Sequence, residues 1–137
     1  MLFIPKKSKF KKQQKGRAFN KISNNLNFNK IEGDLGLKAL SFGKITSKQL
    51  KAIRQLINKI IKKSGQLQMC AFPQTPITKK PKEIRMGKGK GNVDHWVLKV
   101  KPGFILCKIR TNSLLLCSKA LNLVKFRFPI KTKIVYK

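Results

Sequence analysis

The sequence predicts an α+β fold that combines two helices with a mixed, mainly antiparallel sheet and a basic, extended amino-terminal arm. Two segments carry apolar residues at helical spacing, several short runs alternate between apolar and polar residues, and residues 5–31 are basic and Asn-rich with only weak periodicity. A chain of 137 residues is long enough for one compact domain. We expect the arm to comprise residues 1–31 and a single α+β domain to comprise residues 32–137.

The amino-terminal arm is the first element. A segment of this composition buries too little apolar surface to fold alone, and such arms commonly become ordered on a nucleic acid. Phe10, Phe19 and Phe28 lie between the charges, where they could stack on bases or pack back onto the domain. The residues of the arm that we expect to contact phosphates are Lys6, Lys7, Lys9, Lys11, Lys12, Lys15 and Arg17.

The clearest helix is predicted over residues 47–64. Thr46 followed by Gln49 predicts a capping box, and Gly65 is predicted to end the helix in the left-handed conformation. Lys48 and Lys51 lie on the polar face, where we expect phosphate contacts because few acids are present to pair with them; a solvated face is the alternative. The apolar face is formed by Leu50, Ile53, Leu56, Ile57, Ile60 and Ile61.

Short strands are predicted between the two helices. Residues 66–72 alternate as a strand, and the prolines that follow indicate an extended loop carrying Lys79 and Lys80. Residues 93–100 form the next predicted strand. A turn at Pro102 and Gly103 should reverse the chain into an antiparallel strand over residues 104–109.

The carboxyl-terminal part predicts a second helix over residues 113–126, with Ser113 as its N-cap and Pro129 beyond its end. A last strand is predicted over residues 130–136, and its Lys131 is a further candidate for RNA contact. The predicted apolar face of the helix consists of Leu116, Ala120, Leu121, Leu123 and Val124.

The most unusual stretch is residues 85–92. Glycines at alternate positions let the backbone approach a phosphate closely, and Lys88 and Lys90 add mobile cations. Neither the phosphate-binding spacing of nucleotide hydrolases nor the dinucleotide fingerprint is present, which argues against a nucleotide-dependent enzyme. An RNA-contacting loop is therefore favoured over a plain flexible hairpin. Its residues are Arg85, Met86, Gly87, Lys88, Gly89, Lys90, Gly91 and Asn92.

Charge sets the class of partner. The chain has 33 Lys plus Arg against 4 Asp plus Glu, a formal net charge of +29. Self-repulsion on this scale requires a polyanionic partner, and nucleic acid fits best. The few acids and the single histidine, His95, cannot supply a catalytic pair or a metal site, so we expect no catalytic residue, metal or cofactor. Asp94 is expected on the opposite sheet face from His95.

The sequence also disfavours a cysteine-based metal or redox site and a membrane-spanning protein. Three widely spaced cysteines indicate reduced thiols that pack as small hydrophobic groups. The longest purely apolar run, residues 114–117, is far too short to span a membrane, and no targeting segment is evident.

Several sequence blocks occur in a fixed order, and together they identify a family. A glycine–lysine repeat alone would be weak evidence for a family, whereas the complete ordered set of blocks is specific evidence. The blocks lie at residues 9–12, 15–17, 36–40, 45–50, 72–81, 85–92, 96–97, 102–103 and 129–132. In this order they resemble the bacterial-type large-subunit ribosomal protein L-sixteen family over nearly the whole chain.

The resemblance implies an α+β fold with a hammerhead-like β motif. It also implies contact with large-subunit rRNA near the peptidyl-transferase centre and the aminoacyl-tRNA site, with roles in late subunit assembly and tRNA accommodation. Implied partners are rRNA, aminoacyl-tRNA transiently and neighbouring large-subunit proteins, without homo-oligomers. The loop at residues 85–92 corresponds to the family's basic glycine loop, and residues 6–17 to its rRNA-embedded amino end.

The chain departs from the family at residues 110–115, where an acidic, Gly- and Pro-containing start of the helix is missing, and at residues 20–30. Lys far outnumbers Arg, which indicates AT-rich coding. No room for a transit peptide is evident, so we expect an organelle-encoded protein of the mitochondrial matrix, with chloroplast or bacterial cytoplasm as alternatives. A free basic nucleic-acid-binding or RNA-chaperone protein is the alternative function.

Overall fold

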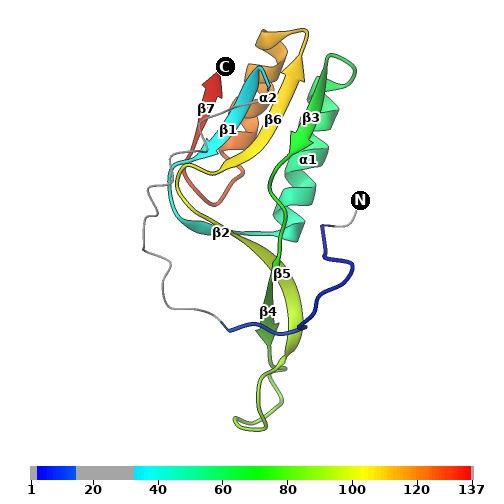
Figure 1. The fold of residues 1–137 in the computed structure, drawn as a ribbon, viewed down its shortest axis with the longest axis vertical. Coiled ribbons are helices and arrows are strands. Elements are labelled where there is room, and N and C mark those ends of the chain that lie inside the picture. Colours follow the sequence, from blue (N-terminus) through cyan, green and yellow to red (C-terminus); the bar gives the residue numbers. More distant parts are fainter. Residues whose placement is uncertain (1–2, 15–32, 137) are drawn as a thin grey trace.

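The computed structural model describes residues 3–14 and 33–136, and within them it confirms the α+β prediction (Figure 1). All strand pairs among these residues are antiparallel. The elements in chain order are β1 (Leu35–Ala39), β2 (Gly43–Thr46), α1 (Ser47–Ile61), β3 (Gly65–Met69), β4 (Thr75–Lys79), β5 (Asn92–Val100), β6 (Ile105–Thr111), α2 (Leu114–Lys125) and β7 (Thr132–Tyr136).

The described strands form two sheets. The larger sheet has the order β3-β6-β1-β7, and the smaller sheet has the order β2-β5-β4. The chain passes from β1 of the larger sheet to β2 of the smaller one and returns through α1 to β3. It then crosses again to β4 and β5 of the smaller sheet before it ends in the larger one with β6 and β7. Figure 1 shows the smaller sheet projecting from the body that the larger sheet forms with the two helices. This projection positions the β4–β5 hairpin away from the core.

The hydrophobic core lies between one face of the larger sheet and the two helices. Leu35 and Leu37 of β1 and Ile109 of β6 are fully buried there. Each fully buried aliphatic side chain of this size contributes about 1.5–3 kcal/mol to folding. The helices also contribute to this core, with Leu50, Ile53, Ile57 and Ile61 from α1, and Cys117, Ala120, Leu121 and Val124 from α2.

Helix α1 confirms the predicted capping box but corrects the predicted end. Thr46 Oγ1 accepts a hydrogen bond from Gln49 N–H at 3.3 Å, and Gln49 Oε1 accepts from Thr46 N–H at 2.9 Å. The helix ends at Ile61, and Lys62, not Gly65, has the positive φ of 48°. Gly65 begins β3 instead. A glycine is needed there because a Cβ would lie 2.8 Å from the carbonyl oxygen of Arg110.

Helix α2 confirms the predicted apolar face at Ala120, Leu121 and Val124 but not at its other two positions. Ser113 is at the N-cap position, but its side chain makes no capping hydrogen bond. Leu116 and Leu123 are 44% and 58% exposed, so their assignment to the apolar face is wrong. The buried residues recur at three- and four-residue spacing from Cys117, which sequence reasoning left out because the neighbouring leucines are more apolar.

The strand predictions were right for β3, β5, β6 and β7 to within a few residues, and the turn at Gly103 is present with φ 88°. Strands β1 and β2 were not predicted, and β4 was wrongly predicted as a loop. Strand β4 contains Pro76, which cannot donate a ladder hydrogen bond. It is tolerated because β4 is an edge strand of the smaller sheet.

Candidate nucleic-acid interface

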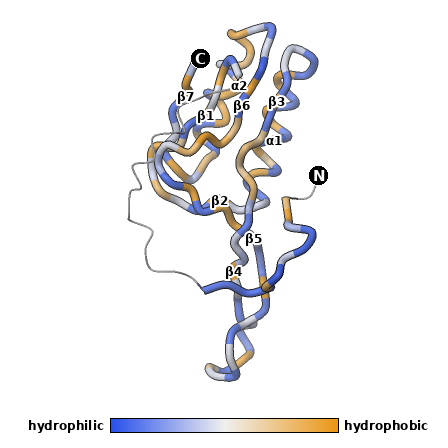
Figure 2. The backbone as a smooth tube through the Cα atoms, viewed as in Figure 1, coloured by the Kyte–Doolittle hydropathy of each residue, from blue (hydrophilic) through white to orange (hydrophobic). Residues whose placement is uncertain are grey.

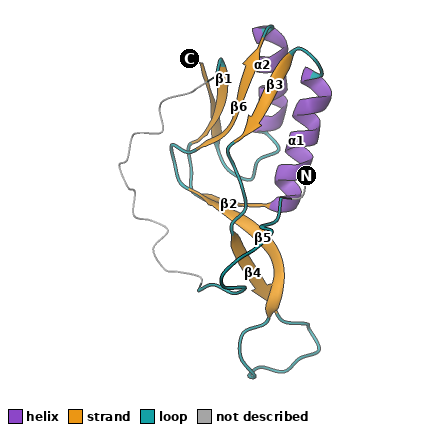
Figure 3. Cartoon of the chain, turned by 45° about the vertical axis from the view of Figure 1, so that its right-hand side comes forward, coloured by secondary structure: helices purple, strands orange, loops and turns teal. Residues whose placement is uncertain are grey.

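The β4–β5 hairpin carries the loop that the sequence singled out. Lys79 at the end of β4 pairs with Asn92 at the start of β5, and residues 80–91 connect them. Figure 3 shows this connection as a wide loop at the far end of the smaller sheet. Residues 81–90 are all exposed, so the loop contributes nothing to the core.

The glycines of this loop have two different roles. Gly87, Lys88 and Gly89 have consecutive positive φ angles of 105°, 51° and 77°, a conformation that side chains with a Cβ rarely adopt. Nothing lies within 4 Å of a Cβ built at Gly87 or Gly89. At Gly91 a Cβ would lie 2.7 Å from the carbonyl oxygen of Lys79, so this glycine permits close approach of the backbone. The alternating pattern therefore combines left-handed turns with a tight base.

The cations of the loop divide into free ends and internal supports. Arg85 and Lys88 are exposed, and Met86 between them is fully exposed. Lys80 donates a hydrogen bond to the carbonyl of Gly87, which fixes the tip of the loop to its base. Lys90 donates to the carbonyl of Gln13. We expected Lys90 to be a mobile cation, but this hydrogen bond holds its side chain against the arm.

The amino-terminal arm lies against the hairpin. Lys12 Nζ donates to the carbonyl oxygen of Lys90 at 2.8 Å, so the contact between Lys90 and the arm is reciprocal. Gln13 and Gln14 line a cavity of about 220 Å³ together with residues of β2, β4 and β5. Figures 1 and 3 show the arm crossing beside β4 and β5. Residues 3–14 of the arm thus lie against the domain.

A second anchor holds the beginning of the arm. Phe3 is buried and belongs to the core cluster, with its ring centroid 6.4 Å from that of Phe72. The Arg54 guanidinium of α1 lies 5.9 Å from the same ring, within the range of a cation–π interaction. The contacts at Phe3 and at Lys12 and Gln13 leave the residues between them on the surface.

The middle of the arm presents cations and one aromatic ring. Phe10 is 67% exposed, and Lys9 Nζ lies 5.7 Å from its ring centroid. Figure 2 shows this part of the arm as mostly hydrophilic. The predicted residues Lys15 and Arg17, with Phe19 and Phe28, lie outside the described residues. The predicted arm lysines that the structure shows exposed are Lys6, Lys7, Lys9, Lys11 and Lys12.

Asp94 and His95 contact each other, which corrects the expectation that they face opposite sides. Asp94 Oδ2 and His95 Nδ1 are 2.9 Å apart. The register between β4 and β5 skips Asp94, since Ile77 pairs with His95 and Thr78 with Val93, and this bulge breaks the strict alternation of side chains. The hydrogen bond from His95, with the charges of His95, Lys79 and Lys48, lowers the pKa of Asp94.

The remaining predicted residues lie in two places. Lys48 is in the first turn of α1 and Lys79 is at the end of β4, and the positive charges of both help to lower the pKa of Asp94. Lys51 is exposed further along α1. Lys131 lies elsewhere, directly before β7, where its N–H donates to Ser41 Oγ at 3.1 Å. The arm and the hairpin are therefore the main basic cluster among the predicted residues.

Other classes of site find no support in the described part of the chain. No three His, Cys, Asp or Glu side chains gather there as a metal would require. No helix among these residues is long and apolar enough to cross a membrane. Cys107 and Cys117 are buried, and Cys70 is partly buried. The fold and its exposed basic hairpin and arm define a small, strongly basic α+β protein.

Comparison with known proteins gives the family. Residues 5–135 match the model of the family described as ribosomal protein L16p/L10e. The chain is 46% identical over 133 residues to the large ribosomal subunit protein uL16c of Euglena longa, covering 97% of each chain. It is 41% identical over 135 residues to the large ribosomal subunit protein uL16 of Dichelobacter nodosus, covering 97% of this chain and 96% of the relative. The uL16 of Blochmanniella pennsylvanica is 43% identical over 136 residues, with 98% of each chain covered.

The chain belongs to the ribosomal protein L16p/L10e family, in its bacterial and organellar form. It is a structural ribosomal protein and not an enzyme. The family predicted from the ordered sequence blocks is thereby confirmed.

Proposed function

We propose that this protein is built into the large ribosomal subunit and binds rRNA near the peptidyl-transferase centre and the aminoacyl-tRNA site. The observation that carries the proposal is the exposed loop at residues 85–92, held on a projecting hairpin and braced by the basic arm. The names of the relatives, which match over nearly their whole length, support the large subunit. In this setting the chemistry of peptide transfer belongs to RNA.

The loop and the arm have distinct roles in the proposal. Gly87 and Gly89 expose backbone N–H groups, and the ends of Arg85 and Lys88 reach outward, so the tip is suited to contact a tRNA or rRNA backbone. The arm, with Lys6 to Lys12, lies along the side of the hairpin and is suited to an rRNA groove. Because Lys90 joins the two parts, binding of one is expected to position the other.

The proposal includes roles in late subunit assembly and in tRNA accommodation. A chain of charge +29 stays compact most easily when RNA phosphates surround it, which fits late incorporation into a nearly complete subunit. Partners in this setting are rRNA, neighbouring large-subunit proteins and, transiently, aminoacyl-tRNA. For about 8 neutralised phosphates, affinity should fall by roughly 10³–10⁵ between low and moderate salt.

We also propose that the protein is organelle-encoded and acts in the mitochondrial matrix. The support is the excess of Lys over Arg, the many Asn and Ile residues, and the divergence at residues 110–115. The relatives above are bacterial and plastid-type proteins. Fractionation of the source cells with detection of this chain by mass spectrometry tests the location, and recovery in plastids or in a bacterial cytoplasm would refute it.

Sedimentation tests the ribosomal proposal. Native lysate is run on sucrose gradients with and without magnesium chelation, and this chain is followed by mass spectrometry. We expect it to move with the large subunit and to remain there after the subunits separate. Recovery in light fractions or with bulk DNA would instead support a free basic nucleic-acid-binding or RNA-chaperone protein.

A further inference from the structure

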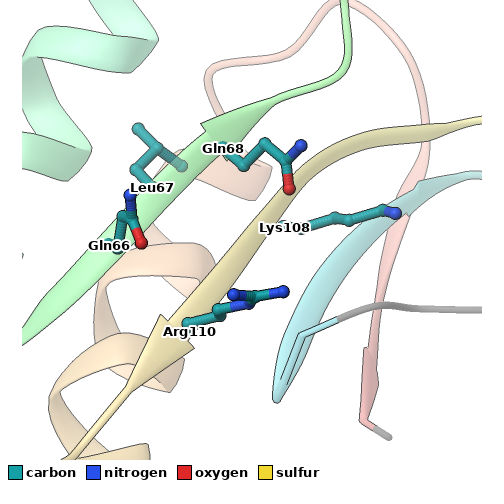
Figure 4. A pocket seen from close by; sticks show the side chains of 5 residues that line it. All are labelled: Gln66, Leu67, Gln68, Lys108 and Arg110. Carbon is teal, nitrogen blue, oxygen red and sulfur yellow. The ribbon is translucent and has the colours of Figure 1, made fainter.

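Four long polar side chains stand together on β3 and β6, away from the hairpin. Gln66 is directly opposite Arg110, and Gln68 is directly opposite Lys108. Because directly opposed residues share one face of an antiparallel pair, all four project from the same side. Figure 4 shows Gln68, Lys108 and Arg110 lying over the strands in this way, whereas Leu67 points away from them. We call this group the β3–β6 shelf.

The shelf is on the face of the larger sheet that the helices do not cover. The residues between its members, Leu67 and Ile109, point to the helices, and Ile109 is fully buried. Gln66, Gln68 and Arg110 are exposed, and Lys108 is half-buried. The four side chains and Leu67 line a hollow of about 330 Å³. A ligand can therefore reach two cations and two amides at once.

One acidic side chain of the described residues, that of Asp34, lies at the end of the same sheet. Asp34 precedes β1 at the end of the sheet, and its carboxylate accepts a hydrogen bond from Thr111 N–H at 2.8 Å. No ion pair joins Asp34 to Arg110. Lys108 has polar or electrostatic contacts of its own, so Arg110 is the cation most available to a ligand.

We propose that the β3–β6 shelf is a second RNA-binding surface of this protein, separate from the hairpin and arm. Arg110 would fork onto phosphate oxygens, Lys108 would neutralise an adjacent phosphate, and the amides of Gln66 and Gln68 would bond ribose hydroxyls or base edges. This inference rests on the proposed function, because it assumes that the polyanion is RNA. A protein partner is disfavoured because the shelf offers cations and amides but no apolar centre.

The two surfaces lie on different sheets, with β4 and β5 in the smaller one and β3 and β6 in the larger one. Figure 1 shows the shelf strands in the body and the hairpin loop at the opposite end of the molecule. One chain can thus hold two RNA segments at a fixed separation. Such a bridge would give the protein a direct part in joining separate segments of rRNA during assembly.

Footprinting on extracted large-subunit rRNA tests the proposal with the full-length protein. The shelf variant carries Lys108→Gln and Arg110→Gln, the hairpin variant carries Arg85→Gln and Lys88→Gln, and Lys119→Gln with Lys125→Gln on α2 is a control of equal charge. We expect the wild type to protect two sets of nucleotides from hydroxyl radicals. The shelf variant should lose one set and keep the other, the hairpin variant should do the reverse, and the control should keep both.

Salt titration supplies a second readout. Each lost phosphate contact should reduce the slope of log affinity against log salt by about 0.7–0.9, so the shelf variant should lose roughly 1.4–1.8. The inference would be overturned if a shelf variant with an unchanged circular dichroism spectrum kept the wild-type protections and the wild-type salt slope. The proposed function would then remain intact. Loss of a protein cross-link with an unchanged RNA footprint would also overturn the inference. Failure of the wild type to protect any nucleotide would instead contradict the proposed function. A variant that fails to fold is replaced by Gln66→Ala with Gln68→Ala, which leaves the strand charges in place and should weaken the same set of protections.

Discussion

Lys12 donates a hydrogen bond from Nζ to the backbone carbonyl oxygen of Lys90, 2.8 Å away, although the two residues are 78 positions apart in the chain. The ammonium group of Lys90 in turn donates to the carbonyl of Gln13. Backbone carbonyls here do what carboxylates do in most proteins, because only four acids are present. Two like-charged segments are thereby held side by side, which concentrates positive charge where we propose that RNA binds.

Removing this contact should release the arm. We expect Lys12→Met with Lys90→Met to increase cleavage at Phe10 by a protease specific for aromatic residues, because the arm is no longer held on the hairpin. The effect should be modest, since charge-assisted hydrogen bonds contribute about 1.5–3 kcal/mol at most and less at exposed sites. Lys88→Met removes an exposed charge from the same loop and is the matched control. Equal cleavage of the wild type and the double variant would contradict the role of these hydrogen bonds.

Loss of charge at the tip should impair assembly without unfolding the protein. We expect Lys88→Ala with Lys90→Ala to weaken incorporation into the large subunit or tRNA accommodation, because we propose that the loop contacts phosphates, and it contributes nothing to the core. The measurements are the fraction of the variant found in large subunits on gradients and the thermal unfolding of the isolated protein. The single variant Lys88→Ala separates phosphate contact from arm docking, since only Lys90 bonds to the arm. Unfolding of the double variant, or normal assembly and translation, would show that the loop is wrongly assigned.

The two roles of the loop glycines predict an order of effects. Gly91→Ala places a Cβ 2.7 Å from the Lys79 carbonyl oxygen, so the base of the hairpin must shift, at a cost of about 1–3 kcal/mol. Gly89→Ala meets no neighbour but keeps the strained φ of 77°, at about 1–2 kcal/mol confined to an exposed loop. Gly89→Asn should be milder than Gly89→Ala, because Asn adopts this conformation more readily. Hydrogen exchange of the β4 and β5 amides measures the order, and faster exchange in Gly89→Ala than in Gly91→Ala would contradict it.

Much of this fold could be predicted from local sequence signals. The start of α1 is encoded by Thr46 and Gln49, and the turn by Gly103, because each is a backbone requirement met within a few residues. Strand β1 was missed because its alternation extends over only five residues, and its identity depends on pairing with both β6 and β7. The face of α2 was predicted only in part because burial follows the packing partner, which places Cys117 inside and the more apolar Leu123 outside.

The candidate site divides in the same way. The glycine–lysine loop can be predicted from the sequence, because glycines at alternate positions indicate special backbone conformations. The contact of Lys90 with the arm depends on tertiary structure and has no local signal. The shelf was also missed, because Gln66 and Arg110 become neighbours only through the register of β3 with β6. The Asp94–His95 contact required a bulge that no spacing rule predicts.

Cys107 predicts a pH dependence of stability. Burial, followed by the influence of the Cys70 thiol, raises its pKa from 9.0 to about 12. The unfolded chain therefore loses this proton at lower pH than the folded chain, and the thiol's contribution to stability declines as pH rises from 9 towards 12. We expect the free-energy difference between the wild type and Cys107→Ala to shrink by up to about 1.4 kcal/mol per pH unit in this range. Denaturant titrations at pH 8 and pH 10 measure the difference, and a constant difference would show that the thiolate is not disfavoured by the fold.

A buried hydroxyl group at the start of β7 should be dispensable. Thr132 is 3% exposed, and its Oγ1 has no hydrogen-bond partner in the described structure. It pairs with Ala39 and so shares the helix-facing side of the larger sheet with Leu37. An unpaired buried hydroxyl costs about 1–3 kcal/mol, whereas valine has nearly the same shape and no polar atom. We expect Thr132→Val to raise the free energy of unfolding by about 1 kcal/mol and the Tm by roughly 3 °C, as measured by calorimetry. Thr132→Ala is the control: it removes the hydroxyl but leaves a cavity, so it should be less stable than Thr132→Val. A lower stability of Thr132→Val than of the wild type would show that the hydroxyl has a partner in the folded protein.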